Sequence, residues 1–195
     1  MIVLGLTGSI GTGKSTTAAM FRDLDIPVHD ADATVHDLYS GEAVLPVAAR
    51  FPGALKEGVI DRKALSALLA EAPEGFRDLE AIIHPLVRAR EAAFLARERE
   101  KGAPLVVLDI PLLYETGGEA RVDKVVVVTC DPRTQHARVL ARPGMTEEKF
   151  QLILSRQMPD AEKRRRADFI IDTGRGLEAA RKQVEEVIAE LTSRM

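Results

Sequence analysis

The stretch "GLTGSIGTGKSTT", residues 5–17, decides the fold. From Gly8 to Ser15 it follows the pattern G-x-x-x-x-G-K-[ST]. The apolar run at residues 2–6 predicts a buried strand before it, and residues 15–24 predict a helix after it. Glycines let the backbone wrap closely around a ligand, and the bare N–H groups at a helix start attract anions. The stretch therefore predicts a phosphate-binding loop.

The side chains of this loop have distinct expected roles. Lys14 supplies a positive charge for the β- and γ-phosphates, and Ser15 offers its hydroxyl to Mg²⁺. The alternative is a glycine turn that only packs the helix on the strand. The position between a predicted strand and a predicted helix favours binding of a nucleoside triphosphate, and we expect ATP with Mg²⁺.

Composition limits the class of protein. A chain of 195 residues, 46% of them hydrophobic, can form one domain, or one domain with an inserted lobe. The net charge of −3 argues against a nucleic-acid binder or a polybasic membrane anchor. No apolar run is long enough to span a bilayer, and the N-terminus lacks a basic leader. The single cysteine, Cys130, suits a reducing compartment, so we expect a cytoplasmic protein.

Apolar stretches alternate with helical patterns along the chain. Further strands are predicted at 26–32, 104–110, 124–130 and 168–173, and further helices at 132–142, 146–158 and 176–193. Strands that are apolar throughout suit a parallel sheet covered on both faces. This alternation predicts an α/β fold, with a doubly wound sheet of five parallel strands flanked by helices.

One connection is too long to be a loop. About seventy residues separate the second strand from the third, and they carry helical patterns. Asp61 is a plausible N-cap for the first pattern. Pro85 is expected at the first position of a later helix that ends near Gly102. Residues 33–103 are therefore predicted to be a helical lobe inserted into a single domain, 1–195.

Residues 138–166 stand out by their charge. They contain eight Lys or Arg residues and four acidic residues, a local charge of +4 in a chain of net charge −3. One interpretation is a solvated helical face. The other is a basic helical lid that closes over a polyphosphate.

The remaining signals favour a small-molecule kinase among proteins with this loop. A GTPase switch reads guanine with N-K-x-D, and the chain contains no Asn. A motor or transporter ATPase needs a longer core, and a polynucleotide kinase needs a basic, aromatic-rich groove. In a kinase, the inserted lobe holds the acceptor, and the basic segment excludes water from the transferring phosphoryl group.

Acidic residues follow two of the predicted strands. Asp30 and Asp32 of "HDAD" end the second strand, where alternation on extended backbone would turn both toward the cleft. One of them is expected to orient an acceptor hydroxyl or accept its proton, and N-capping of the next helix is the alternative for each. Asp109 ends the strand at 104–110 and fits an acid near Mg²⁺, with capping of the next turn as its alternative.

Together these motifs resemble one family over most of the chain. "GLTGSIGTGKST", "HDAD", "IIHPLVR", "LDIPLLYE", Q-x-x-R-x-x-x-R and "RQM…K…ADFIIDTG" occur in that order. The chain resembles the dephospho-coenzyme A kinases from Ile2 to Gly176. The resemblance implies transfer of the γ-phosphoryl group of ATP to the ribose 3′-hydroxyl of dephospho-CoA, the last step of coenzyme A biosynthesis. A nucleoside monophosphate kinase is the alternative.

The resemblance also implies roles for residues on both sides of the reaction. Asp32 would approach the acceptor hydroxyl, and His84 and Arg88 of "HPLVR" would shape the acceptor pocket. The residues implied to wrap the ATP phosphates are Gly11, Thr12, Gly13, Lys14, Ser15 and Thr16, with Gly8 opening the motif.

Two later motifs complete the implied site. Leu112, Leu113 and Glu115 of "DIPLLYE" would line the boundary between the lobe and the cleft, and Arg138 and Arg142 of the lid would reach the ATP phosphates. The expected catalytic set is Lys14, Asp32 and Arg142.

The chain departs from the family pattern at a few positions. Tyr114 stands where Phe is frequent, and Thr173 stands where Asn is frequent, which puts a polar contact at position 173 in doubt. The expected partners are the small molecules dephospho-CoA and ATP, without nucleic acid or membrane, and a monomer is expected.

Overall fold

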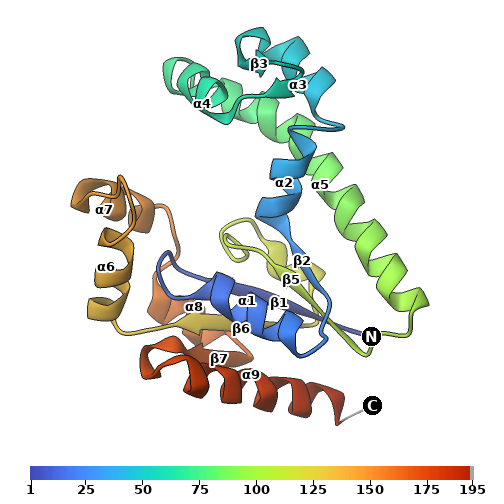
Figure 1. Ribbon diagram of the computed structural model, residues 1–195, viewed down its shortest axis with the longest axis vertical. Coiled ribbons are helices and arrows are strands. Elements are labelled where there is room, and N and C mark those ends of the chain that lie inside the picture. Colours follow the sequence, from blue (N-terminus) through green and yellow to red (C-terminus); the bar gives the residue numbers. More distant parts are fainter. Residues whose placement is uncertain (194–195) are drawn as a thin grey trace. The chain divides into compact units, whose positions relative to one another are not determined.

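The computed structural model describes residues 1–193 and divides into two compact units. The first unit contains Met1–His29 and the chain from Glu98 onward, and the second contains Asp30–Arg97. Figure 1 labels most of the helices and strands of both units. The described residues contain no helix with both the length and the apolar composition needed to cross a membrane.

The first unit is built around a five-stranded sheet with the order β2-β5-β1-β6-β7. Its strands are β1 (Ile2–Gly8), β2 (Val28–Asp30), β5 (Leu105–Asp109), β6 (Lys124–Thr129) and β7 (Phe169–Asp172). β1 pairs in parallel with β5 on one side and β6 on the other, and β6 pairs in parallel with β7. The predicted α/β fold with five parallel strands is confirmed.

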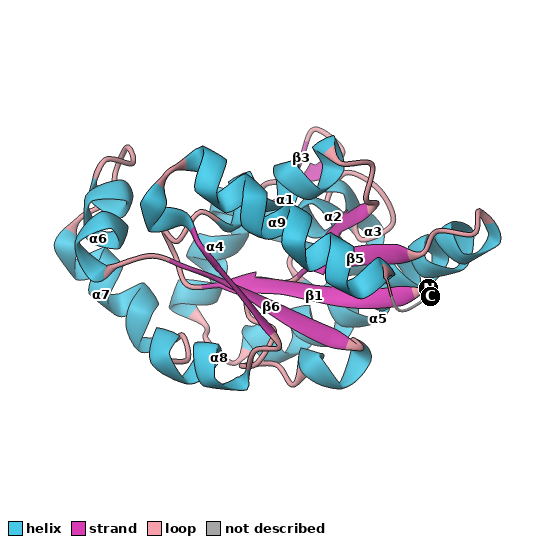
Figure 2. Ribbon diagram, turned by 90° about the horizontal axis from the view of Figure 1, so that it is seen from below, coloured by secondary structure: helices cyan, strands magenta, loops and turns pink. Residues whose placement is uncertain are grey.

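Helices cover both faces of this sheet. Figure 2 shows α1 and α9 on one side and α8 on the other. The helices of the unit are α1 (Lys14–Asp23), η2 (Gly118–Arg121), α6 (Pro132–Leu140), α7 (Glu147–Ser155), α8 (Asp160–Arg166), η3 (Thr173–Arg175) and α9 (Leu177–Thr192).

The alternation of side chains along β1 explains this layering. Leu4 and Leu6 point to the face where the core is completed by α1 and α9, through residues such as Phe21 and Val184. On the other face, a Cβ at Gly5 would meet Leu113 at 3.0 Å, so that position lies directly under the segment that follows β5. Burial on both faces is why these strands read as continuous apolar runs.

The second unit is mostly helical and has its own apolar core. Its elements are α2 (Ala31–Leu38), α3 (Val44–Arg50), η1 (Pro52–Ala54), β3 (Leu55–Lys56), β4 (Val59–Ile60), α4 (Arg62–Glu71) and α5 (Gly75–Glu100), which continues into the first unit. Asp61 caps α4 as predicted, with its side chain accepting a hydrogen bond from the N–H of Ala64 at 2.7 Å. The boundaries of the unit differ by a few residues from the expected 33–103.

Two local expectations in this unit are wrong. Pro85 lies inside the single helix α5 rather than starting a new one, because Ile82, Ile83 and Leu86 pack into the core on both sides of it and outweigh the missing N–H. Asp32 lies in the first turn of α2, so the argument from strand alternation fails. Asp30 is the N-cap of α2 and accepts a hydrogen bond from the N–H of Ala33 at 2.9 Å.

Candidate active site

The loop after β1 has the backbone that a phosphate cradle requires. Gly11 and Gly13 have φ angles of 80° and 97°, a region that residues with a Cβ rarely adopt. Gly13 is the N-cap of α1 and has no side chain to accept from the first-turn N–H groups. These donors are therefore left for a ligand, at the positive end of the helix dipole.

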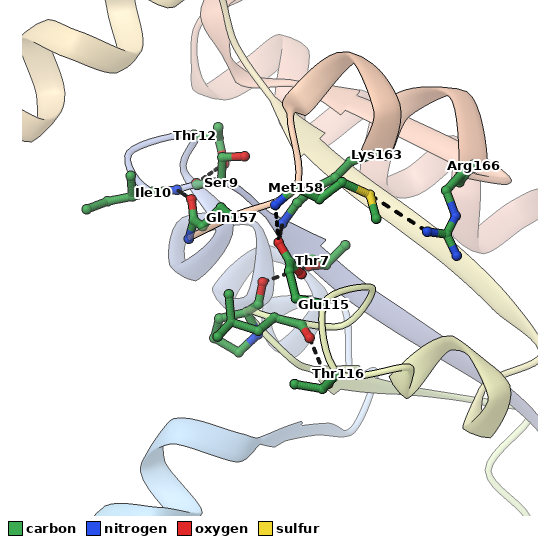
Figure 3. A network of polar contacts seen from close by, with 12 residues as sticks. Thr7, Ser9, Ile10, Thr12, Glu115, Thr116, Gln157, Met158, Lys163 and Arg166 are labelled. Carbon is green, nitrogen blue, oxygen red and sulfur yellow. Dashed lines mark hydrogen bonds and ion pairs between the residues drawn. The ribbon is translucent and has the colours of Figure 1, made fainter. Parts of the chain in front are cut away.

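Two glutamine side chains hold the outer part of the loop. Gln157 accepts a hydrogen bond from the N–H of Ile10 at 3.0 Å, and Gln135 donates one to the carbonyl oxygen of Ile10 at 2.7 Å. Figure 3 shows the contact between Gln157 and Ile10 beside Ser9 and Thr12. Within the loop, the hydroxyl of Thr12 donates to the carbonyl oxygen of Ser9 at 2.9 Å. The loop conformation is thus supported by side chains from outside the motif.

Lys14 and Asp109 form an ion pair beside the loop. Nζ of Lys14 lies 2.5 Å from Oδ1 of Asp109, whose side chain is 2% exposed at the carboxyl end of β5. The adjacent strands β1 and β5 bring the two groups together. The contact holds the ammonium group next to the phosphate loop.

Thr173 connects the loop to the basic segment. Its hydroxyl donates to the carbonyl oxygen of Thr12 at 2.6 Å and accepts from Nη1 of Arg138 at 2.8 Å. Nη2 of the same arginine donates to the carbonyl oxygen of Thr173 at 3.0 Å. The polar contact left in doubt by the sequence is therefore made by threonine in this chain.

A pocket of about 330 Å³ opens beside this connection. It lies between the start of α1, the two arginines of the basic segment and the start of α9, and its lining includes Met20, Arg138, Arg142 and Leu177. The pocket also includes Gly11 and Gly13, so it adjoins the phosphate loop directly. Behind the loop, the Sγ atom of Cys130 lies 4.0 Å from the carbonyl oxygen of Gly11, and burial raises the pKa of this thiol.

The segment after β5 binds α8 rather than presenting all its side chains to a cleft. Glu115 lies 2.8 Å from Nζ of Lys163 and accepts a hydrogen bond from the N–H of Met158, also at 2.8 Å (Figure 3). Burial tends to raise the pKa of Glu115, but the hydrogen bonds from these two donors outweigh it and lower the pKa. Leu113 is fully buried, whereas Leu112 is 40% exposed.

The second unit holds the remaining expected residues. Asp32 is exposed in the first turn of α2, and His84 and Arg88 are exposed on α5. His84 and Arg88 are four residues apart on the helix and share one face. Because α5 runs through Pro85, His84 lies within the helix and not just before a helix start.

Sequence reasoning missed three supporting groups in the first unit. Gln135 and Gln157 contact the loop from residues distant in the sequence, and although both stand in motifs of the family, the motifs did not reveal that these side chains hold the loop. Lys163 is fully buried, although it begins the run "KRRR" and its charge alone does not separate it from the three arginines that follow. Pairing with Glu115 distinguishes it, and that pairing depends on the tertiary structure.

Comparison with known proteins places the chain among kinases. Residues 2–178 match the family model described as dephospho-CoA kinase. The dephospho-CoA kinase of Rhizobium meliloti is 61% identical over 191 residues, which cover 98% of both chains. A crystal structure of TT1252 from Thermus thermophilus has a TM-score of 0.86 at 38% identity, covering 98% of both chains. The dephospho-CoA kinase from Campylobacter jejuni has a TM-score of 0.74 at 27% identity, covering 98% of this chain and 97% of that one.

Proposed function

This chain belongs to the dephospho-CoA kinase family, and we propose how its own residues carry out the family's reaction. The enzyme transfers the γ-phosphoryl group of ATP to dephospho-CoA, giving CoA and ADP in the final step of coenzyme A biosynthesis. The acceptor oxygen forms a bond to the γ-phosphorus while the bond to the β–γ bridging oxygen breaks. Such transfer passes through a loose transition state, so the protein mainly positions the reactants and neutralises charge.

The phosphate loop carries the proposal. The first-turn N–H groups of α1 and the ammonium of Lys14 would hold the β- and γ-phosphates, with Gly11, Thr12, Gly13 and Thr16 completing the cradle. The single observation behind this assignment is the loop's own conformation, with two glycines at positive φ leading into an uncapped helix. The contact with Asp109 keeps the ammonium beside that position.

The adjoining pocket suits the nucleoside part of ATP. Its volume of about 330 Å³ combines apolar groups, such as Met20 and Leu177, with the guanidinium groups of Arg138 and Arg142. A planar base can pack between such groups, because arginine stacks on π-systems. Arg138 is already held by Thr173, so we assign charge neutralisation on the transferring group to Arg142.

Mg²⁺ would complete the phosphate site. Ser15 is exposed in the first turn of α1 and offers a hydroxyl, while Asp109 offers a carboxylate at the end of β5. Mg²⁺ prefers such hard oxygen donors and usually binds with phosphate oxygens and water. When bound, the ion would neutralise charge on the β- and γ-phosphates.

We assign the acceptor to the second unit. Asp32 would accept a hydrogen bond from the 3′-hydroxyl and align it, taking its proton as the new bond to phosphorus forms. His84 and Arg88 share one face of α5 and would contribute to the acceptor pocket. Leu112 is exposed enough to contact an acceptor, whereas Leu113 and Glu115 would act by shaping the segment around it.

We further propose that the enzyme acts in the cytoplasm as a monomer.

The role of Asp32 is tested by Asp32→Asn, with Asp37→Asn on the same helix as the control. We expect kcat for dephospho-CoA to fall by about a hundredfold, because the amide cannot accept the proton, while KM for ATP stays unchanged. A coupled ADP assay measures both, with AMP, adenosine, uridine and shikimate as comparison acceptors. Wild-type kcat in Asp32→Asn would contradict the assignment.

A further inference from the structure

The helical unit contains a hollow that the roles proposed so far leave unused. It has a volume of about 460 Å³ and lies between the last turn of α2 and the start of α4. His36 and Tyr39 line it from α2 and the residue after it, and Arg62 and Lys63 line it from α4. Ile60 contributes a buried apolar side chain.

The charge of this hollow is unbalanced. The side chains of Arg62 and Lys63 form no ion pair or hydrogen bond with any residue in 1–193. The one carboxylate in the lining, Asp61, is already engaged, accepting from the N–H of Ala64 at 2.7 Å and lying 3.0 Å from Nζ of Lys56. Two cations therefore face the hollow with no anion of the described chain to match them.

Solvated cations are common on protein surfaces, so the tyrosine that lines the hollow with them adds a second feature. The Tyr39 side chain is largely buried, at 9% exposure, while its hydroxyl is open to solvent and makes no hydrogen bond within the described chain. The hydroxyl is therefore available to a ligand in the hollow. Burial raises the pKa of Tyr39 while the charge of Arg62 acts in the opposite direction, so the hydroxyl stays protonated and can donate. An oxygen-rich anion in the hollow would accept from it.

The position of the hollow along α2 indicates which anionic group of the substrates would bind there. Tyr39 follows Asp32 by seven residues, which is about 10 Å at the rise of an α-helix. His36 is four residues from Asp32 and therefore lies on the same face of the helix. In dephospho-CoA, the 5′-diphosphate is attached to the same ribose that carries the reacting 3′-hydroxyl. A ribose aligned at Asp32 would place the diphosphate further along α2.

We infer that the hollow is the subsite for the acceptor's diphosphate, with Arg62 and Lys63 pairing with its charges and Tyr39 donating a hydrogen bond. The inference rests on the proposed role of Asp32 for the position of the ribose. His36 closes the side nearest Asp32. The phosphates of ATP carry the same kind of charge, so ATP is the competing ligand for this hollow. The binding experiment distinguishes ATP from dephospho-CoA.

The test measures binding by isothermal titration calorimetry, in Arg62→Gln, Lys63→Gln and Tyr39→Phe. Arg77→Gln is the matched control, because Arg77 is exposed in the same unit and does not line the hollow. We expect Kd for dephospho-CoA to rise about tenfold in Arg62→Gln and Lys63→Gln and about threefold in Tyr39→Phe, and to stay unchanged in Arg77→Gln. Kd for ATP should be unchanged in all four.

Adenosine, which lacks the diphosphate, provides the second arm. Its affinity should not respond to Arg62→Gln, and inorganic pyrophosphate should compete with dephospho-CoA in the wild type. Equal loss of adenosine and dephospho-CoA affinity, a wild-type Kd for dephospho-CoA in both cation variants, or weakened ATP binding would each overturn the inference. Loss of kcat in Asp32→Asn with unaltered dephospho-CoA binding in Arg62→Gln would reject the subsite and leave the proposed function standing.

Discussion

The phosphate loop of the first unit and the hollow of the second differ in how their polar groups are satisfied. Around the loop, Lys14 contacts Asp109, Arg138 contacts Thr173, and both glutamines hold Ile10. In the hollow, Arg62, Lys63 and the hydroxyl of Tyr39 find no partner within residues 1–193. The loop is held in shape before a ligand binds, as transition-state stabilisation requires. The hollow leaves its hydrogen bonds and charges for a ligand to complete.

The loop and the hollow should differ most in how much activity depends on them, and the largest loss of turnover should come from removing the cation of the loop. Lys14→Ala deletes the charge that neutralises the β- and γ-phosphates, and we expect turnover to fall by at least about a thousandfold. The far-ultraviolet circular dichroism spectrum should remain that of a folded protein. The coupled ADP assay measures the rate, with Lys124→Ala on β6 as a control for loss of a lysine. A rate within tenfold of wild type would mean that the loop amides suffice without it.

The next largest effect concerns the buried pair that fastens α8 to the segment after β5. Lys163→Met leaves the carboxylate of Glu115 without its cation, and we expect the free energy of unfolding at pH 7 to fall by about 3 kcal/mol. Urea titration measures it, and Lys182→Met, at an exposed position of α9, should change it little.

The same pair predicts a pH dependence. The pKa of Glu115 is lowered in the folded protein, so its contribution is present above the ordinary glutamate pKa of about 4.3 and is lost as the pH falls through the lowered value. The stability difference between wild type and Lys163→Met should therefore shrink between pH 5 and pH 3. A difference that stays constant over this range would show that the pair contributes through packing alone.

A smaller effect should follow from cutting the link between the loop and the pocket. Thr173→Val removes the hydroxyl that contacts both Thr12 and Arg138, and we expect KM for ATP to rise three- to tenfold. Thr116→Val deletes a hydroxyl that bonds only the carbonyl oxygen of Leu112, and serves as the matched control. If both variants bind ATP equally well, the loop does not depend on this hydroxyl.

Much of the sheet unit could be predicted from the sequence, because its signals are local. Apolar runs predict the five strands, and the glycine pattern predicts the loop and the start of α1. The helical unit was harder. A proline usually ends or begins a helix, and only the apolar packing on both sides of Pro85 keeps α5 continuous. Capping by Asp30 likewise makes Asp32 helical, which strand alternation could not reveal.

The supporting contacts of the site were the least predictable. Lys163 and its neighbour Arg164 have similar side chains in the sequence, yet one is buried and the other is 47% exposed. Which of them points inward depends on the rotation of α8 against β6, and a helix of seven residues with four consecutive basic residues carries little periodic signal. Asp61 and Lys14, by contrast, could be predicted from short local patterns: Asp61 stands at a helix N-cap, and Lys14 stands in the phosphate-loop motif.

The position of Cys130 offers a practical consequence. This is the only thiol in the chain, and it sits behind the phosphate loop against the carbonyl oxygen of Gly11. Cys130 is half-buried and also lines a hollow of about 450 Å³ with Pro132 and Gln135, so a maleimide reagent can approach the sulfur atom from that side. Labelling would therefore place a reporter directly behind the phosphate loop without an engineered cysteine, and mass spectrometry would verify the site of attachment.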